Sequence, residues 1–217
     1  MKRIFSVIAL VLSLVCINGC KCSNKANFAF FKNKVSNIEN YRYYVIKQEI
    51  YKEDLLLYRE NKSVYLNDDK YRIEIDVKEI EEIDSEDLYN ERYEEYYQKG
   101  TDFYYKENNK WKITESENKF SNIGFLIEED MMSAYQIKEE KGNKLLIGSL
   151  KEDKISSFFG FDIVGATDVT LNVEVDNSDR VTCLSISYTS KNDNKIKVSI
   201  DVGYDYVIQF NLPVVQQ

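Results

Sequence analysis

The clearest pattern in the sequence is an alternation of apolar and polar residues over the last fifty positions. Three runs show it, with polar turns between them: 169–175, 184–188 and 196–204. Such alternation is typical of strands in an antiparallel sheet that packs one face on a core and exposes the other to water. Apolar residues continue at every second position to Leu212. We therefore expect an antiparallel meander whose last strand ends at Pro213.

Earlier parts of the chain show the same alternation. The run 71–77 alternates apolar with charged residues, which predicts a half-buried strand. Aromatic and β-branched residues, which favour strands, predict further strands at 41–51, 55–66, 93–98, 103–106, 135–139 and 144–150. Residues 79–90 are acidic, and we expect them to be irregular. Thirteen of the 17 tyrosines lie between Tyr41 and Tyr105. Tyrosine rings can stack on sugars or bases, but a half-buried sheet surface explains them more simply.

Helical spacing replaces the alternation in three segments. Their apolar residues recur three or four positions apart, which places them on one face of a helix. The segments are 27–37, with Phe28, Phe31 and Val35; 120–134, with Phe120, Ile123, Ile127, Met131 and Ala134; and 152–159, with Ile155, Phe158 and Phe159. An antiparallel sheet with one apolar face must cover that face. The pattern therefore predicts an α+β fold whose short helices cover the sheet.

The first twenty residues have the pattern of an export signal. Lys2-Arg3 precedes the uncharged run 4–17, whose 14 residues are fewer than the roughly 20 that span a membrane. The run ends in Ile17-Asn18-Gly19-Cys20, which resembles the bacterial lipobox. We expect cleavage between Gly19 and Cys20 and attachment of lipid to the Cys20 thiol. A plain secreted protein cut nearby and a retained signal anchor are the alternatives.

This pattern divides the chain into three parts. We expect a signal peptide over 1–19, a lipidated tether over 20–26 and a single domain over 27–217, held on the extracytoplasmic face of the cell membrane. Loss of the signal changes the formal net charge from −8 to −10. A balance this acidic argues against nucleic acid as a partner. The domain is expected to be a monomer.

The composition excludes several kinds of chemistry. The chain has no histidine, which is the commonest general base and metal ligand. No glycine-rich phosphate loop or Gly-x-Ser-x-Gly motif occurs. We therefore expect no enzyme activity, no cofactor and no metal site. Cys22 and Cys183 are the cysteines left for a disulfide, but their spacing alone does not establish that pair.

Two acidic groups leave alternatives open. Residues 128–130 could supply the carboxylates of a glycosidase, although a solvated helix start is the simpler interpretation. Residues 176–179 are similar to a calcium loop but lack its glycine and its closing glutamate. A hairpin turn is the simpler interpretation there.

The order of elements resembles that of a known superfamily. A helix, several antiparallel strands, a helical middle and a final meander ending in Leu212-Pro213 follow a lipobox. This order is similar to the LolA/LppX-like superfamily of bacterial lipoproteins and lipid carriers, and most of all to uncharacterised surface lipoproteins of Gram-positive bacteria. The resemblance covers about 27–213. It implies a strongly curved antiparallel sheet, an open half-barrel, with short helices on its concave apolar face.

Two main hypotheses for function follow. The first is a lipid-anchored extracytoplasmic protein that binds a hydrophobic or amphipathic ligand between the sheet and the helices. The second is a surface interaction or sensor module whose half-barrel is filled by its own side chains. An enzyme acting on carbohydrate is a third, weaker one. For the first, the candidate ligand-binding residues are Tyr71, Ile73, Ile75, Ile123, Ile127, Met131, Phe158, Phe159, Val198, Ile200 and Val202.

Overall fold

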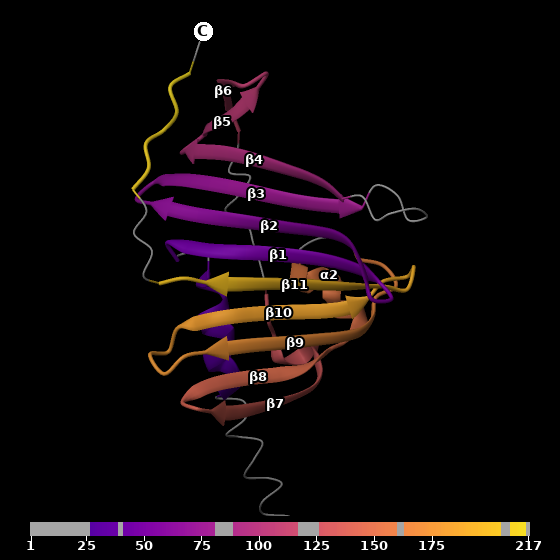
Figure 1. The fold of residues 1–217 in the computed structure, drawn as a ribbon. Coiled ribbons are helices and arrows are strands. Elements are labelled where there is room, and N and C mark those ends of the chain that lie inside the picture. Colours follow the sequence, from indigo (N-terminus) through magenta and orange to yellow (C-terminus); the bar gives the residue numbers. More distant parts are fainter. Residues whose placement is uncertain are drawn as a thin grey trace, which may run out of the picture.

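The computed structural model describes residues 27–38, 41–80, 89–116, 126–159, 163–204 and 209–215. The predicted signal peptide and tether, with Gly19, Cys20 and Cys22, lie outside these ranges, and so does Ile123. Within them, eleven antiparallel strands form one open sheet (Figure 1) in the order β6-β5-β4-β3-β2-β1-β11-β10-β9-β8-β7. Their bounds are β1 Tyr43–Lys52, β2 Leu55–Asn67, β3 Lys70–Ile80, β4 Tyr89–Lys99, β5 Asp102–Glu107, β6 Lys110–Glu115, β7 Met132–Glu140, β8 Asn143–Leu150, β9 Thr167–Val175, β10 Val181–Thr189 and β11 Asn194–Val202.

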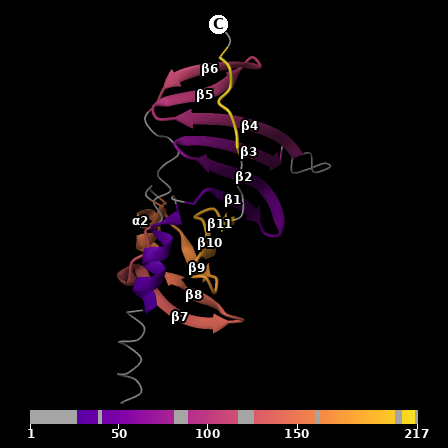
Figure 2. The ribbon, with the colours of Figure 1, turned by 90° about the vertical axis from the view of Figure 1, so that its left-hand side faces the viewer.

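The sheet consists of two meanders joined edge to edge. Strands β1–β6 and β7–β11 each pair with their neighbours in the sequence, and the non-local pairing is between β1 and β11. Its register places Ile46 opposite Ile200 and Gln48 opposite Val198. Figure 2 shows that the joined sheet is bent along its width. The predicted strands and the antiparallel meander at the end of the chain are thus confirmed.

Short helices pack on one face of the β7–β11 half (Figure 2). The N-terminal helix covers residues 27–35, and a 3₁₀ turn, η3 (Glu152–Lys154), leads into α2 (Ile155–Phe159). The helix buries Phe28, Phe31 and Val35, and the Phe28 ring lies 5.2 Å from the ring of Tyr135 on β7. In the part of the chain that the structure describes, no helix is long and apolar enough to cross a membrane.

The predicted helix over 120–134 is wrong in its second half. Residues 129–131 form a single 3₁₀ turn, η2 (Glu129–Met131), and β7 begins at Met132. Ala134 and its neighbours pair with β8 in an antiparallel ladder after a bulge near Met132. The ladder with β8 pairs backbone groups of residues 132–140, and this outweighs the helical spacing of a few apolar side chains.

The prediction that the last strand ends at Pro213 is also wrong. β11 ends at Val202, and residues 209–215 form no strand. The pairing partner of β11 begins at Tyr43, whose carbonyl accepts a hydrogen bond from the Gly203 N–H, so beyond this point the ladder has no further partner. Farther along, the Phe210 ring lies 5.8 Å from the ring of Tyr97 on β4.

The region 79–90 is less irregular than expected. β3 continues to Ile80 and β4 already begins at Tyr89. The register of these two strands places Glu79 opposite Asn90, so their ends are paired. The intervening residues, 81–88, lie outside the described part of the chain.

Candidate functional site

The sheet has two chemically different faces, because side chains alternate along each strand. We call the inner face the one whose side chains share a core with the N-terminal helix and α2. Tyr44, Val64, Ile73 and Ile200 belong to it. The opposite face, which carries their neighbours in sequence, is the outer face.

The structure brings the predicted ligand-binding residues together on the inner side. Ile123 and the side chain of Phe159 lie outside what the structure describes. The other nine residues either belong to the buried core or pack against it: Tyr71, Ile73, Ile75, Ile127, Met131, Phe158, Val198, Ile200 and Val202. Ile73, Phe158 and Ile200 are completely buried. Their contact with a ligand stays a prediction.

The inner face is covered unevenly. Over β9 and β10, Leu171, Val173, Leu184 and Ile186 are at most 1% exposed, beneath the two helices. Over β1–β3, Tyr44, Val64, Ile73 and Val77 are buried as well, but Ile46 and Ile75 are only half-buried. The accessible part of the inner face in this half of the sheet is therefore the surface around Ile46 and Ile75.

The inner face of β1–β4 changes from apolar to charged along the strands. The strand register places three rows side by side across β1–β4: Tyr44-Val64-Ile73-Tyr96, then Ile46-Lys62-Ile75-Glu94, then Gln48-Glu60-Val77-Arg92. The first row is apolar and aromatic, the second mixes apolar and charged side chains, and the third is mostly polar. Sequence reasoning missed this gradient because it depends on which residues the register places opposite each other.

Burial and neighbouring charges set the ionisation of the charged rows. Burial lowers the pKa of Lys62, while the carboxylate of Glu60 acts in the opposite direction. The Tyr58 hydroxyl donates a hydrogen bond of 2.7 Å to Glu60, and burial together with this bond raises the pKa of Tyr58 to about 12. The Tyr96 hydroxyl donates to Glu94 in the same way. The carboxylates of this surface are thus held by tyrosine hydroxyls.

One buried polar atom on the inner face has no partner. Gln98 follows Tyr96 on β4 by two positions, lies opposite Tyr71 and Phe103, and is 1% exposed. Its Nε2 donates to the Gly100 carbonyl at 3.0 Å, but its Oε1 accepts no hydrogen bond from the described part of the chain. A buried acceptor left unsatisfied costs about 1–3 kcal/mol. Gln98 is therefore suited to accept a hydrogen bond from a bound molecule.

A separate cleft of about 320 Å³ lies where the N-terminal helix meets the edge of the sheet. Phe30 and Phe31 line it from the helix, and Ile137 and Lys144 from β7 and β8. The Lys144 ammonium lies 4.4 Å from the centre of the Phe30 ring. This cleft combines apolar walls with a cation at its rim.

The acidic groups singled out in the sequence make structural contacts. Glu128 forms an ion pair with Lys32 of the N-terminal helix, and Glu129 accepts a hydrogen bond of 2.7 Å from the Tyr135 hydroxyl. Asp176 accepts the backbone N–H groups of Ser178 and Arg180, which closes the β9–β10 hairpin turn. Across the ranges that the structure describes, no three His, Cys, Asp or Glu side chains are grouped so that they could hold a metal ion.

Cys183 lies on the outer face of β10, in register with Asp201, and forms no disulfide with any residue that the structure describes. Burial, followed by the negative charges of Asp201 and Glu174, raises the pKa of its thiol to about 12. The thiol is therefore protonated at neutral pH. The pairing with Cys22 stays untested, because Cys22 lies outside the described residues.

Comparisons with known proteins give likenesses in structure. No family model and no curated protein matches the sequence. The chain is similar to the solved structure of LprF from Mycobacterium bovis, with 9% sequence identity, a TM-score of 0.46, and coverage of 84% of this chain and 95% of that one. It is also similar to a LolA superfamily protein from Nitrosomonas europaea, with 11% identity, a TM-score of 0.29, and coverage of 84% and 93%. These likenesses identify no ligand and no residue role.

Proposed function

We propose that this protein is a lipid-anchored extracytoplasmic lipoprotein that binds a hydrophobic or amphipathic ligand between its sheet and its helices. The observation that carries the proposal is the gradient on the inner face of β1–β4. Ile46 and Ile75 are half-buried there, and Lys62 and Glu94 occupy the same row. An apolar chain would lie over the half-buried Ile46 and Ile75 of the second row, and a polar group would reach the charged side chains of the second and third rows.

The shape of the sheet supports this proposal. An open, bent sheet with helices on one face leaves part of its apolar surface available to a guest molecule. We take the inner face to be the concave side of a half-barrel, with the helices covering one half and the ligand occupying the other. The Gln98 Oε1 would then meet a hydroxyl or N–H group of the ligand.

The proposal of a lipid anchor is based on the lipobox-like sequence that ends in Cys20. Two or three acyl chains at the mature N terminus hold a protein firmly on a membrane, whereas one chain holds it only marginally. The wild-type protein should partition with membranes and carry the mass of the lipid on Cys20. Cys20→Ala should abolish the modification. Detection of an unmodified mature N terminus elsewhere in the wild-type protein would refute this part of the proposal.

The alternative is a sensor or interaction module with a self-filled half-barrel. The specific observation in its favour is that Ile73, Phe158 and Ile200 are completely buried by the protein itself. Such a module would use the polar outer face to contact a partner protein. In that case the inner face would hold no small molecule.

Binding of a dansyl-labelled fatty acid distinguishes the two functions. Ile75→Lys introduces a charge at a half-buried position on the inner face of β3, and Val45→Lys makes the same change on the outer face of β1, in the same meander. We expect saturable binding by the wild-type protein and by Val45→Lys, and at least a ten-fold weaker affinity for Ile75→Lys with a similar melting temperature. Absence of saturable binding by the wild-type protein, together with no lipid in organic extracts of natively purified protein, would favour the self-filled module.

A further inference from the structure

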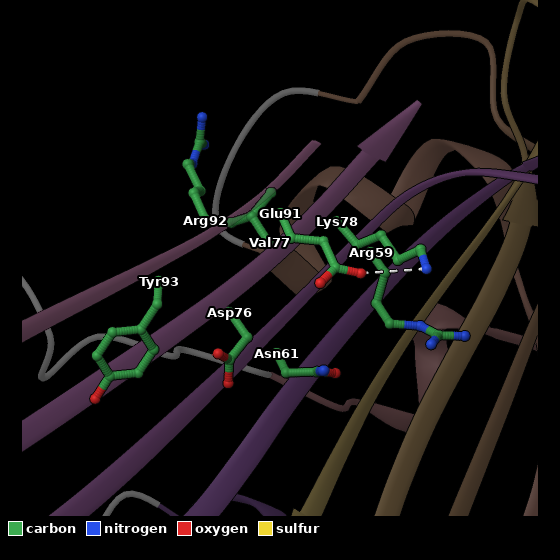
Figure 3. A pocket seen from close by; sticks show the side chains of 8 residues that line it. All are labelled: Arg59, Asn61, Asp76, Val77, Lys78, Glu91, Arg92 and Tyr93. Carbon is green, nitrogen blue, oxygen red and sulfur yellow. Dashed lines mark ion pairs between the residues drawn. The ribbon is translucent and has the colours of Figure 1, made fainter. Parts of the chain in front are cut away.

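The outer face carries a cleft that the proposed function does not use. It has a volume of about 340 Å³ and lies across β2, β3 and β4. Figure 3 shows the six side chains that line it from this face: Arg59, Asn61, Asp76, Lys78, Glu91 and Tyr93. Its volume falls within the range of small-molecule sites, about 300–1,000 Å³.

Three of these residues lie side by side in a row across the three strands and have polar or aromatic groups that a ligand could contact. The register places Asn61 opposite Asp76, and Asp76 opposite Tyr93. The Tyr93 ring is 54% exposed, and its hydroxyl donates a hydrogen bond of 3.1 Å to Glu74, which fixes the position of the ring. No described residue forms a side-chain hydrogen bond or an ion pair with Asn61 or Asp76. An amide, a carboxylate and an aromatic ring are therefore available together.

The charges around this row are already paired with one another. On one side, Arg59 pairs with Glu49 at 2.9 Å and Lys78 pairs with Glu91 at 3.3 Å (the dashed line in Figure 3). On the other side, Arg72 pairs with Glu95 at 3.1 Å. A ligand in the cleft would thus meet little uncompensated charge apart from the carboxylate of Asp76.

We propose that this cleft binds a sugar residue of a glycan. The exposed face of a tyrosine ring can stack on the apolar face of a sugar, and tyrosine combines an apolar body with a polar end. Hydroxyl groups both donate and accept hydrogen bonds, so they match the acceptor-only carboxylate of Asp76 and the donor-and-acceptor amide of Asn61. The row thus provides a stacking platform at one end and two planar polar groups beside it.

Other ligand classes fit the cleft less well. A phosphate group would meet the carboxylate of Asp76, which is unpaired among the described residues, whereas Arg59 and Lys78 are already paired with Glu49 and Glu91, and the formal net charge of −8 opposes nucleic acid. A protein partner would need an apolar centre that excludes water, whereas five of the six lining side chains are polar or charged. A neutral polyhydroxylated ligand uses the groups that are available.

The test is a titration of the whole mature protein with neutral oligosaccharides of hexoses and N-acetylhexosamines, followed by ¹⁵N–¹H NMR. The side-chain amide of Asn61 gives its own signals, which report directly on the cleft. We expect these signals and the backbone signals of Asp76 and Tyr93 to shift with at least one oligosaccharide. Tyr93→Ala should weaken that binding about ten-fold or more, while Tyr93→Phe, which keeps the ring, should retain most of it.

Tyr97→Ala is the matched control, because Tyr97 lies on the same face of β4 but lines no part of this cleft. It should leave sugar binding unchanged. Shifts that do not involve the Asn61 amide, equal binding by a folded Tyr93→Ala protein, or no binding by any oligosaccharide at millimolar concentration would overturn the proposal. Binding of the labelled fatty acid should be the same in all these variants, so the proposed function can fail or succeed independently.

Discussion

Glu49 on β1 and Arg59 on β2 form an ion pair of 2.9 Å across the outer face of the sheet. The carboxylate also lies 2.9 Å from the Lys47 ammonium, and Glu49 is only 3% exposed although it belongs to the water-facing side. Burial acts to raise the pKa of Glu49, but the hydrogen bonds and charges of Lys47 and Arg59 outweigh it, so the pKa lies below its ordinary value. The ion pair of Glu49 with Arg59 therefore links β1, the strand that pairs with the second meander, to β2.

Lowering the pH should destabilise the folded protein, because it protonates Glu49. Because the pKa of Glu49 is lower in the folded state than in the unfolded state, the pair stabilises the protein fully above the unfolded pKa, near 4.5. The stabilisation is lost as the pH falls through the folded pKa. Melting temperatures measured from pH 7 to pH 3 should therefore fall less steeply for Glu49→Gln than for the wild-type protein.

An exposed pair provides the control for this prediction. Lys138 and Glu140 lie 4.0 Å apart on β7, and both side chains are largely in water. Glu140→Gln should leave the pH profile unchanged, since exposed pairs contribute little. Identical profiles for Glu49→Gln and the wild-type protein would show that the Glu49 cluster does not contribute to the acid dependence.

Truncation of the core should be costly where the two meanders meet. Ile200 on β11 is fully buried and faces Ile46 of β1 and Leu184 of β10. Ile200→Ala should lower the free energy of unfolding by about 2–5 kcal/mol, as lost burial and a new cavity add together. Urea denaturation measures this change. Ile113→Ala, at a site 45% exposed on β6, should change the stability by less than about 0.5 kcal/mol.

The period of the apolar residues was enough to predict much of this sheet. In the run from Ile196 to Val202, Val198 and Ile200 are buried in the core while Lys197 and Asp201 are exposed, so the alternation reports a real difference between core and water. The spacing of Ile127, Met131 and Ala134 misled, because Met132 is buried as well and the segment pairs with β8. Two adjacent buried methionines fit the start of an edge strand better than one stripe of a helix.

The two binding surfaces depend on register, which a single sequence does not reveal. Lys62 and Glu60 point to the inner face, although their charge alone predicts a position in water. Likewise, Asn61, Asp76 and Tyr93 are far apart in the sequence and become neighbours only through the pairing of β2, β3 and β4. The sequence places the residues on strands, and the pairing places them beside each other.

Cys183 should be unreactive in the folded protein. Its pKa of about 12, caused first by burial and then by Asp201 and Glu174, leaves almost no thiolate at pH 8, and the thiolate is the reactive form. Labelling with a maleimide at pH 8 should therefore be much slower in native than in urea-unfolded protein. A Cys183→Ser variant identifies the signal that belongs to this residue. No labelling after unfolding without a reductant would instead point to a disulfide with Cys22.

Gln98 offers the most direct test of a polar contact inside the sheet. Its Oε1 is buried without a partner, while its Nε2 holds the carbonyl of Gly100 in the β4–β5 turn. Gln98→Met, similar in size and without hydrogen-bonding groups, loses the bond to Gly100 but also removes the unsatisfied acceptor. Because the lost bond, about 0.5–1.5 kcal/mol, and the removed acceptor, about 1–3 kcal/mol, act in opposite directions, the variant should be destabilised by no more than about 1 kcal/mol relative to the wild-type protein.

Gln98→Met should weaken the binding of ligands that donate a hydrogen bond to Oε1 and leave the binding of other ligands unchanged. A ligand with a hydroxyl group, such as a dansyl-labelled monoacylglycerol, should bind the Gln98→Met variant several-fold more weakly, because it loses the acceptor. The matching methyl ether, which has no hydrogen to donate at that position, should bind both proteins equally. Fluorescence titrations of both proteins with both probes give the comparison. An equal loss of affinity for both probes would mean that Gln98 contributes to binding by packing alone. A large drop in the stability of Gln98→Met would mean that the bond to Gly100 outweighs the unsatisfied acceptor.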